Sequence, residues 1–155
     1  MVQCRFRWKG SENVGKFQNF DLITPTEKEA RVALNNRDDG VERVAQTLMQ
    51  QSKSANLIIK LSSGGFIAYT TEKEFINRQH FPAICPNPLD VAGAGDSLLA
   101  CMAVSLCAGN SVMLSAALGA CMAGLAVQTV GNLPISQDQL RQLLLKQFPN
   151  TLMTN

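Results

Sequence analysis

Asp90-Val91-Ala92-Gly93-Ala94-Gly95-Asp96-Ser97 is a glycine-rich segment that directly precedes a long apolar run. Gly93 and Gly95 lack a Cβ atom, so the backbone there can turn sharply and come close to a ligand. The run that follows predicts a helix, whose first N–H groups have no partners inside the helix and carry partial positive charge. Such a helix start binds anions, phosphate among them. The segment therefore predicts an anion site with the Asp96 carboxylate beside it.

Asp96 is open to two interpretations. A carboxylate next to a phosphate site suits a general base that takes the proton from a hydroxyl group attacking phosphorus. The alternative is that Asp96 only caps a helix after a glycine-rich turn. Spacing alone favours this alternative, because a short glycine-rich loop is weak evidence for a phosphate site.

The pattern D-x-x-G-A-G-D-S, followed by a helix of small residues, resembles the signature of the ribokinase/PfkB family of carbohydrate kinases. The resemblance implies that Asp96 is the catalytic base and that the backbone from Ala92 to Gly95 forms the anion hole for the transferred phosphoryl group. Gly93, Ala94 and Gly95 would then act in catalysis, and Ala92 would contact the nucleotide. The resemblance also implies an α/β, ribokinase-like layered fold, of which this chain is the C-terminal part, with a central mostly parallel sheet flanked by helices.

Composition indicates a compact globular chain. The 155 residues are a single-domain length, and 46% hydrophobic against 17% charged residues excludes a disordered chain. A net charge of +2 is too small to indicate nucleic acid or an anionic membrane as a partner. Residues 97–137 carry no charge, but the break at Gly109-Asn110-Ser111 favours two buried helices over a membrane span.

Cysteine and histidine usage argues against a metal cluster. The five cysteines are odd in number and form no C-x-x-C, which indicates reduced thiols in a reducing compartment and so a cytoplasmic location. The single histidine, His80, has no cysteine near it in the sequence. We expect it to be a strand or loop residue.

Hydrophobic periodicity and turn residues predict alternating strands and helices, typical of a layered α/β fold. The later strands form a hairpin around the Ser62-Ser63-Gly64-Gly65 turn. The expected strands are 20–24, 56–61, 66–69 and a more polar region at 72–81. The expected helices are 26–34, 41–51, 96–108, 111–129 and 137–148.

The segment Thr24-Pro25-Thr26-Glu27-Lys28-Glu29-Ala30 resembles the family's T-P-N-x-x-E-A. In that motif Asn and Glu act on the magnesium ion that accompanies ATP, largely through water. Only Glu29 matches, since Thr26 replaces the Asn. The resemblance implies a water-mediated magnesium role for Glu29. Alternatively, Glu29 only completes a capping box with Thr26, and both roles can hold together.

The segment 60–65 resembles the family's T-L-G-S-x-G turn at the nucleotide phosphates and adenosine. Ser63 and Gly65 match the pattern, which implies that they bind the nucleotide, whereas Ser62 stands where glycine is usual. An ordinary hairpin turn explains the segment equally well. Ala123 and Val127 fall in a loosely matching helix that lines the adenine pocket in the family, and plain core packing is the alternative for them.

Asp90 matches the first aspartate of the family signature. In many relatives that aspartate and the following threonine help to hold a monovalent cation, so potassium is a further candidate cofactor beside ATP and Mg²⁺. The threonine is Val91 here. The alternative is that Asp90 binds nearby backbone N–H groups.

The resemblance covers residues 20–144 and corresponds only to the C-terminal, nucleotide-binding part of a family member. We therefore expect a fragment without the N-terminal sugar-binding half and lid. The implied function is ATP-dependent phosphorylation of a sugar or sugar-phosphate hydroxyl, closest in appearance to heptose-7-phosphate kinases and their fused kinase–nucleotidyltransferase relatives. The expected partners are a nucleotide and a small sugar; a homodimer and a fused or separate nucleotidyltransferase domain are compatible with this. The alternative is a non-catalytic nucleotide-binding or assembly module.

Overall fold

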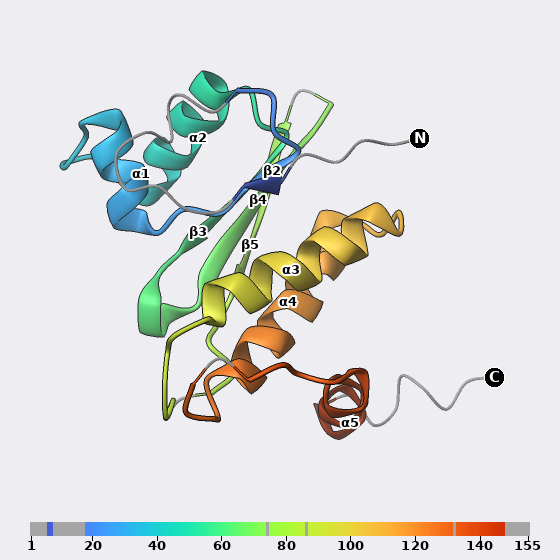
Figure 1. Ribbon diagram of the computed structural model, residues 1–155. Coiled ribbons are helices and arrows are strands. Elements are labelled where there is room, and N and C mark those ends of the chain that lie inside the picture. Colours follow the sequence, from blue (N-terminus) through green and yellow to red (C-terminus); the bar gives the residue numbers. More distant parts are fainter. Residues whose placement is uncertain (1–5, 8–17, 74, 86, 132, 148–155) are drawn as a thin grey trace.

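The computed structural model describes residues 6–7, 18–73, 75–85, 87–131 and 133–147. It shows one sheet with a pair of helices on each face (Figure 1). In chain order the elements are β1 (Phe6–Arg7), β2 (Leu22–Ile23), α1 (Glu27–Leu34), α2 (Val41–Ser52), β3 (Asn56–Lys60), the 3₁₀ turn η2 (Ser62–Gly64), β4 (Phe66–Glu72), β5 (Phe75–Phe81), α3 (Ala94–Cys107), α4 (Val112–Ala126) and α5 (Gln137–Gln147).

The sheet has five strands in the order β1-β2-β3-β4-β5. β1–β2 and β2–β3 pair in parallel, whereas β3–β4 and β4–β5 pair antiparallel. The expectation of a mostly parallel sheet is therefore wrong for the described residues, while the predicted hairpin is confirmed. Parallel pairing needs a long crossover, which α1 and α2 supply between β2 and β3. The short turn after β3 permits only antiparallel pairing.

Alternation along β3 separates two hydrophobic cores. Leu57 and Ile59 are fully buried on the face that α1 and α2 cover, and Ile58 is fully buried on the face that α3 and α4 cover. Burial on both faces explains why the strand is a continuous apolar run. Each core is therefore buried only when its pair of helices packs against the sheet.

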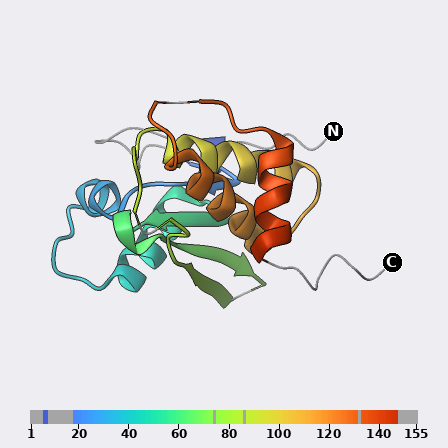
Figure 2. The ribbon, with the colours of Figure 1, turned by 90° about the horizontal axis from the view of Figure 1, so that it is seen from below.

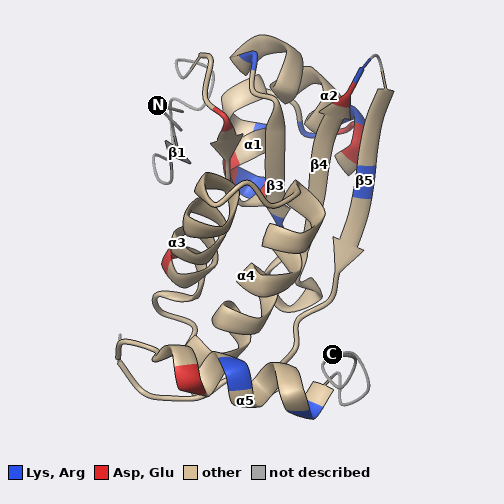
Figure 3. Ribbon diagram, turned by 90° about the vertical axis from the view of Figure 1, so that its right-hand side faces the viewer, with Lys and Arg blue, Asp and Glu red and all other residues tan. Residues whose placement is uncertain are grey.

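The small residues of α4 let α3 pack closely against it. A Cβ atom on Gly119 would lie 2.7 Å from the Leu98 side chain, so a larger residue cannot occupy this position without movement. Figure 3 shows α4 and nearly all of α3 without charged side chains. The expectation that both helices are buried all round is only partly right, because Val104 on α3 is 73% exposed. A helix packed against one sheet and one neighbour buries one side only.

The last helix, α5, lies beyond α4 and away from α1 and α2 (Figures 1 and 2). Ser136 and Gln139 cap its start reciprocally, with N–H to side-chain oxygen distances of 3.2 and 2.8 Å. Its apolar residues Leu140, Leu143 and Leu144 are half-buried, and the expected last residue of this helix, Phe148, lies outside the described residues. None of the described helices is long and apolar enough to cross a membrane.

The cysteines agree with the expectation of free thiols as far as they are described. Cys85, Cys101, Cys107 and Cys121 are all free, and Cys4 lies outside the described residues. Burial raises the pKa of the Cys101 and Cys121 thiols, which favours the unreactive protonated form. His80 lies on β5, as expected of a strand residue.

Candidate functional site

The start of α3 has the geometry of an anion site. Gly93 caps the helix in a left-handed conformation, with φ 77° and ψ −7°. The first intrahelical backbone bond runs from the Ser97 N–H to the Gly93 carbonyl at 2.9 Å, so the N–H groups of Gly95 and Asp96 have no acceptor within the helix, while the Ala94 N–H makes a long bond of 3.4 Å to the Val91 carbonyl. Gly95 does not have a positive φ. Of these two glycines, only Gly93 has a backbone conformation that favours glycine. At Gly95 the absence of a side chain allows a ligand to approach the backbone closely.

This helix start lies at the sheet edge where β2 and β3 end (Figure 1). Thr26 and Lys60 form a parallel bridge, and the Lys60 N–H donates to the Pro25 carbonyl at 3.0 Å. The start of α1 is thereby held beside the end of β3. Ligands of open α/β sheets bind outside the carboxyl ends of the strands, so this is the edge at which a site is expected.

The pKa of Lys60 shows which charged groups lie near it at this edge of the sheet. Burial lowers the pKa of the Lys60 ammonium, and the nearby carboxylates of Glu29 and Asp96 oppose that shift. Two predicted site residues from different elements therefore lie close to one lysine. The sequence gives Lys60 no role of its own, although it is the first residue of the 60–65 segment.

Glu29 completes a capping box, as one of its two interpretations predicts. Its Oε2 accepts a hydrogen bond from the Thr26 N–H at 2.7 Å, and the Thr26 Oγ1 accepts one from the Glu29 N–H at 3.2 Å. The capping box fixes the orientation of the carboxylate at the sheet edge. The magnesium role of Glu29 stays a prediction.

The turn after β3 is a hairpin turn braced against the end of β5. The Leu61 N–H donates to the Gly65 carbonyl at 2.8 Å, and the His80 Nε2 lies 2.8 Å from the Gly64 carbonyl oxygen. Gly65 has φ +83°, and a Cβ atom there would lie 2.1 Å from the Phe81 carbonyl oxygen. Ser63 is exposed at the tip. The hairpin interpretation is confirmed, while nucleotide binding by Ser63 and Gly65 stays a prediction.

Ser62 occupies a backbone conformation that suits glycine, with φ 55°. We expect Ser62→Gly to stabilise the protein by roughly 0.5–1 kcal/mol, since relief of left-handed strain outweighs the extra entropy of glycine in the unfolded chain. Thermal unfolding followed by circular dichroism should show a midpoint a few degrees higher. The matched control is Ser63→Gly, which has no positive φ to relieve and should lower the midpoint. A lower midpoint for Ser62→Gly would contradict the strain argument.

Asp90 ties the segment before α3 to the segment after α4. Its Oδ1 accepts from the Ala92 N–H at 2.9 Å and its Oδ2 from the Gly131 N–H at 3.0 Å. The Val127 carbonyl accepts from the N–H groups of Leu89 and Asp90 at 2.8 and 3.3 Å. The structure therefore bears out the backbone-binding interpretation of Asp90. Cation binding there stays a prediction.

These bonds make the contribution of Asp90 to stability pH-dependent. The backbone N–H donors of Ala92 and Gly131 hold the pKa of Asp90 below its usual 3.8. The stabilisation should be complete above that pH and should fade as the pH drops through the lowered value. We expect Asp90→Asn to be less stable than the wild type at pH 7 in urea unfolding, with the difference shrinking at pH 3. A difference that grows in acid would contradict this assignment.

Ala123 and Val127 lie at the end of α4. Ala123 is half-buried against the core beneath α3, and Val127 is buried at 8% exposure. The core-packing interpretation is thus confirmed for both side chains. The Val127 carbonyl also anchors the segment that leads into α3. A role of either residue in lining an adenine pocket stays a prediction.

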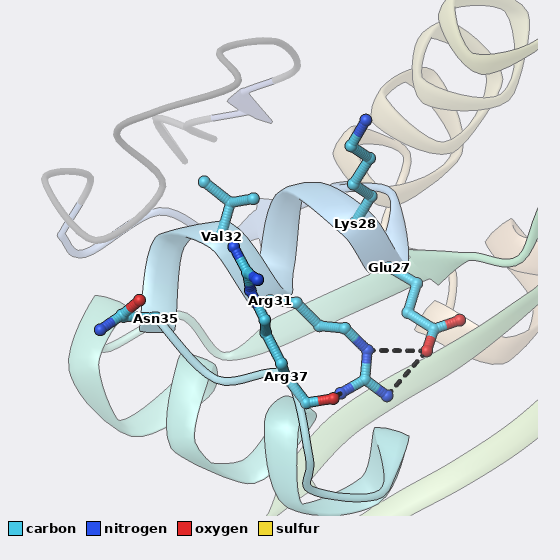
Figure 4. Close-up of a pocket in the computed structure, with 6 residues that line it drawn as sticks. All are labelled: Glu27, Lys28, Arg31, Val32, Asn35 and Arg37. Atoms are coloured by element: carbon cyan, nitrogen blue, oxygen red, sulfur yellow. Dashed lines mark hydrogen bonds and ion pairs between the residues drawn. The ribbon is translucent and has the colours of Figure 1, made fainter.

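A surface pocket elsewhere on the molecule does not coincide with this site. It lies along α1 and the turn that follows (Figure 4). Arg31 there is held by Glu27 at 2.8 Å and by the Asp39 carbonyl at 2.8 Å, so its guanidinium is already engaged. The pocket is lined by Glu27, Lys28, Arg31, Val32, Asn35 and Arg37, none of which is a predicted site residue.

Comparison with known proteins decides the family. Residues 16–138 match the pfkB family carbohydrate kinases. This chain belongs to that family. This chain is 31% identical over 137 residues to the bifunctional protein HldE of Sulfurimonas denitrificans. The alignment covers 86% of this chain and 28% of the HldE protein.

Solved structures of kinases share the fold. The ribokinase of Thermotoga maritima superposes with a TM-score of 0.72 at 24% identity over 85% of this chain and 44% of that chain. The ribokinase of Arabidopsis thaliana in complex with ribose and ATP superposes with a TM-score of 0.68 at 24% identity, over 81% of this chain and 41% of that chain. The predicted ribokinase-like fold is confirmed. The chain spans less than half the length of each of these relatives, and 28% of the HldE protein.

Proposed function

We propose that this chain is the nucleotide-binding and phosphoryl-transferring part of a carbohydrate kinase, which phosphorylates a hydroxyl of a sugar or sugar phosphate with ATP. One observation carries the proposal. Asp96 lies in the first turn of α3, beside outward-pointing N–H groups, at the sheet edge that also holds Glu29. A base and an anion site in this arrangement suit transfer of a phosphoryl group to a hydroxyl.

The residues of this edge divide the chemistry between them. Asp96 takes the proton of the attacking sugar hydroxyl. The backbone N–H groups at Gly93, Ala94 and Gly95 stabilise the charge on the transferred phosphoryl group, an effect of about 2.7–4 kcal/mol per donor in other enzymes. The helix dipole of α3 acts in the same direction.

The remaining candidates would hold the nucleotide and its cations. The Ser63 turn, the Gly65 backbone and Ala92 are proposed to contact the phosphates, with Ala123 and Val127 near the adenine. Magnesium suits this edge, because a carboxylate fixed by a capping box can hold a hydrated hard cation through water. Bound there, magnesium would offset phosphate charge.

Potassium is proposed at the Asp90 segment. Both Asp90 oxygens already accept backbone hydrogen bonds, so neighbouring carbonyl groups would supply much of the coordination. A cation at this place would sit on the segment that leads into α3. Its role would be to support the geometry of the anion site and not to take part in the transfer.

The likeness to HldE proteins favours a heptose phosphate as the sugar and a nucleotidyltransferase domain as a fused or separate partner. A homodimer is compatible with the proposal. We propose a cytoplasmic location, since ATP is available there and the described cysteines are free.

The proposal is tested by calorimetry with ATP and Mg²⁺ and by an ADP-release assay with candidate sugars and sugar phosphates. We expect ATP to bind and a sugar phosphate to stimulate ADP release when the complete kinase is assayed. The second candidate function, a non-catalytic nucleotide-binding or assembly module, is favoured by Thr26, Ser62 and Val91, which stand where the family motifs have other residues. ATP binding without turnover in the complete protein would favour the module, and absence of ATP binding would overturn the kinase proposal.

A further inference from the structure

Lys60 leaves the sheet on the face that carries the anion site. Alternate side chains of a strand point to opposite faces, so Lys60 shares the face of Ile58, which packs in the core beneath α3 and α4. Its antiparallel partner Phe66 lies in the same core. Lys60 is the last residue of β3 and half-buried. Its side chain therefore extends beyond that core, toward the start of α3.

The charges around Lys60 come from two helices. Glu29 lies in the first turn of α1 and Asp96 in the first turn of α3, and both carboxylates act on the Lys60 ammonium. Without the lysine, two negative groups would face a nucleotide phosphate. The helix dipole supplies only about half a positive charge. A polyphosphate that approaches these carboxylates therefore needs further positive charge, and a lysine at this place supplies it in addition to any bound cation.

We propose that Lys60 is a phosphate-binding residue of this site, whose ammonium contacts the terminal phosphate of the nucleotide. The proposal rests on the proposed function and extends it to Lys60, which stands where the T-L-G-S-x-G pattern begins with threonine. A purely structural ion pair between Lys60 and the two carboxylates is the competing explanation. The two differ in a measurable way, since only a phosphate contact makes the affinity that is lost on removing Lys60 depend on how many phosphates the ligand carries.

The experiment measures binding by calorimetry without Mg²⁺, in the presence of EDTA, using ATP, AMP and inorganic tripolyphosphate. The variants are Lys60→Met, Lys60→Arg and the matched control Lys146→Met, which removes an exposed lysine of α5. We expect Lys60→Met to weaken ATP and tripolyphosphate binding about tenfold and AMP binding far less. Lys60→Arg should keep most of the affinity, since a guanidinium also binds phosphate. Lys146→Met should match the wild type.

The outcomes separate this proposal from the proposed function. Unchanged ATP affinity in Lys60→Met, or equal losses for ATP and AMP in a folded variant, would overturn the phosphate contact and leave the kinase proposal intact. Lys60-dependent binding of tripolyphosphate without any binding of ATP, in EDTA and again with Mg²⁺, would support the contact and overturn the kinase. If the wild type binds neither ligand in EDTA, the Lys60 contact falls, and the kinase proposal is decided by the titration with ATP and Mg²⁺. Thermal midpoints of all variants show that each is folded.

Discussion

Asp96→Asn is expected to lower phosphoryl transfer about 10²–10⁴-fold while ATP binding persists. Asparagine keeps the size and shape of the side chain but cannot accept the hydroxyl proton. Removing a negative charge beside the phosphate site also reduces repulsion, so ATP affinity should stay equal or rise. Turnover is measured as ADP release in the complete kinase, and affinity by calorimetry on this chain.

The chain offers a close control for this change. Asp138 also lies in the first turn of a helix, α5, and is exposed there. Asp138→Asn removes the same charge at a helix start away from the sheet edge and should leave turnover unchanged. Wild-type turnover in Asp96→Asn would remove Asp96 from the role of base, and loss of ATP binding together with turnover would point to a structural role instead.

The sequence alone indicates Asp96 and Glu29 as candidates, because each lies in a local pattern that predicts a specific backbone structure. A glycine-rich turn followed by an acid predicts a helix start that binds anions, and a threonine three residues before a glutamate predicts a capping box. Both predictions need no coordinates. The sequence does not predict that both carboxylates lie near Lys60. The effect of both carboxylates on the pKa of Lys60 depends on the parallel placement of β2 beside β3 and on the face from which Lys60 emerges, and no short segment contains this information.

For the fold, too, the sequence predicts local structure better than the pairing of distant segments. Turn residues and periodicity predicted the hairpin around Gly65 and the helix boundaries closely, although α4 ends at Ala126 instead of near residue 129. The mostly parallel sheet came from family resemblance, whereas the described strands are parallel on one side of β3 and antiparallel on the other. The uncharged run that begins at Ser97 predicts a buried helix, yet Val104 on α3 is exposed, because composition does not specify how many neighbours a helix has.

Gly65→Ala is expected to produce the largest loss of stability among these variants. Gly65 has φ +83° and ψ −127°, a region that residues with a Cβ atom rarely adopt. The new methyl group would also lie 2.1 Å from the Phe81 carbonyl oxygen and 2.7 Å from backbone atoms of Pro82 and Ala83. Backbone atoms cannot swing aside as a flexible side chain can. We expect a loss of more than about 3 kcal/mol, measured by urea unfolding.

Gly109→Ala isolates the steric part of this effect. Gly109 has φ +88°, but a Cβ atom there would meet nothing within 4 Å, so only the conformational cost of about 1–2 kcal/mol applies. The difference between the two variants measures how firmly the turn is braced against residues 81–83. Because that brace also fixes the turn directly after Lys60, Gly65→Ala should weaken ATP binding in the folded fraction, whereas Gly109→Ala should not. Equal losses of stability in both variants would mean that the end of β5 yields, and the turn could then not hold phosphate-binding groups in place.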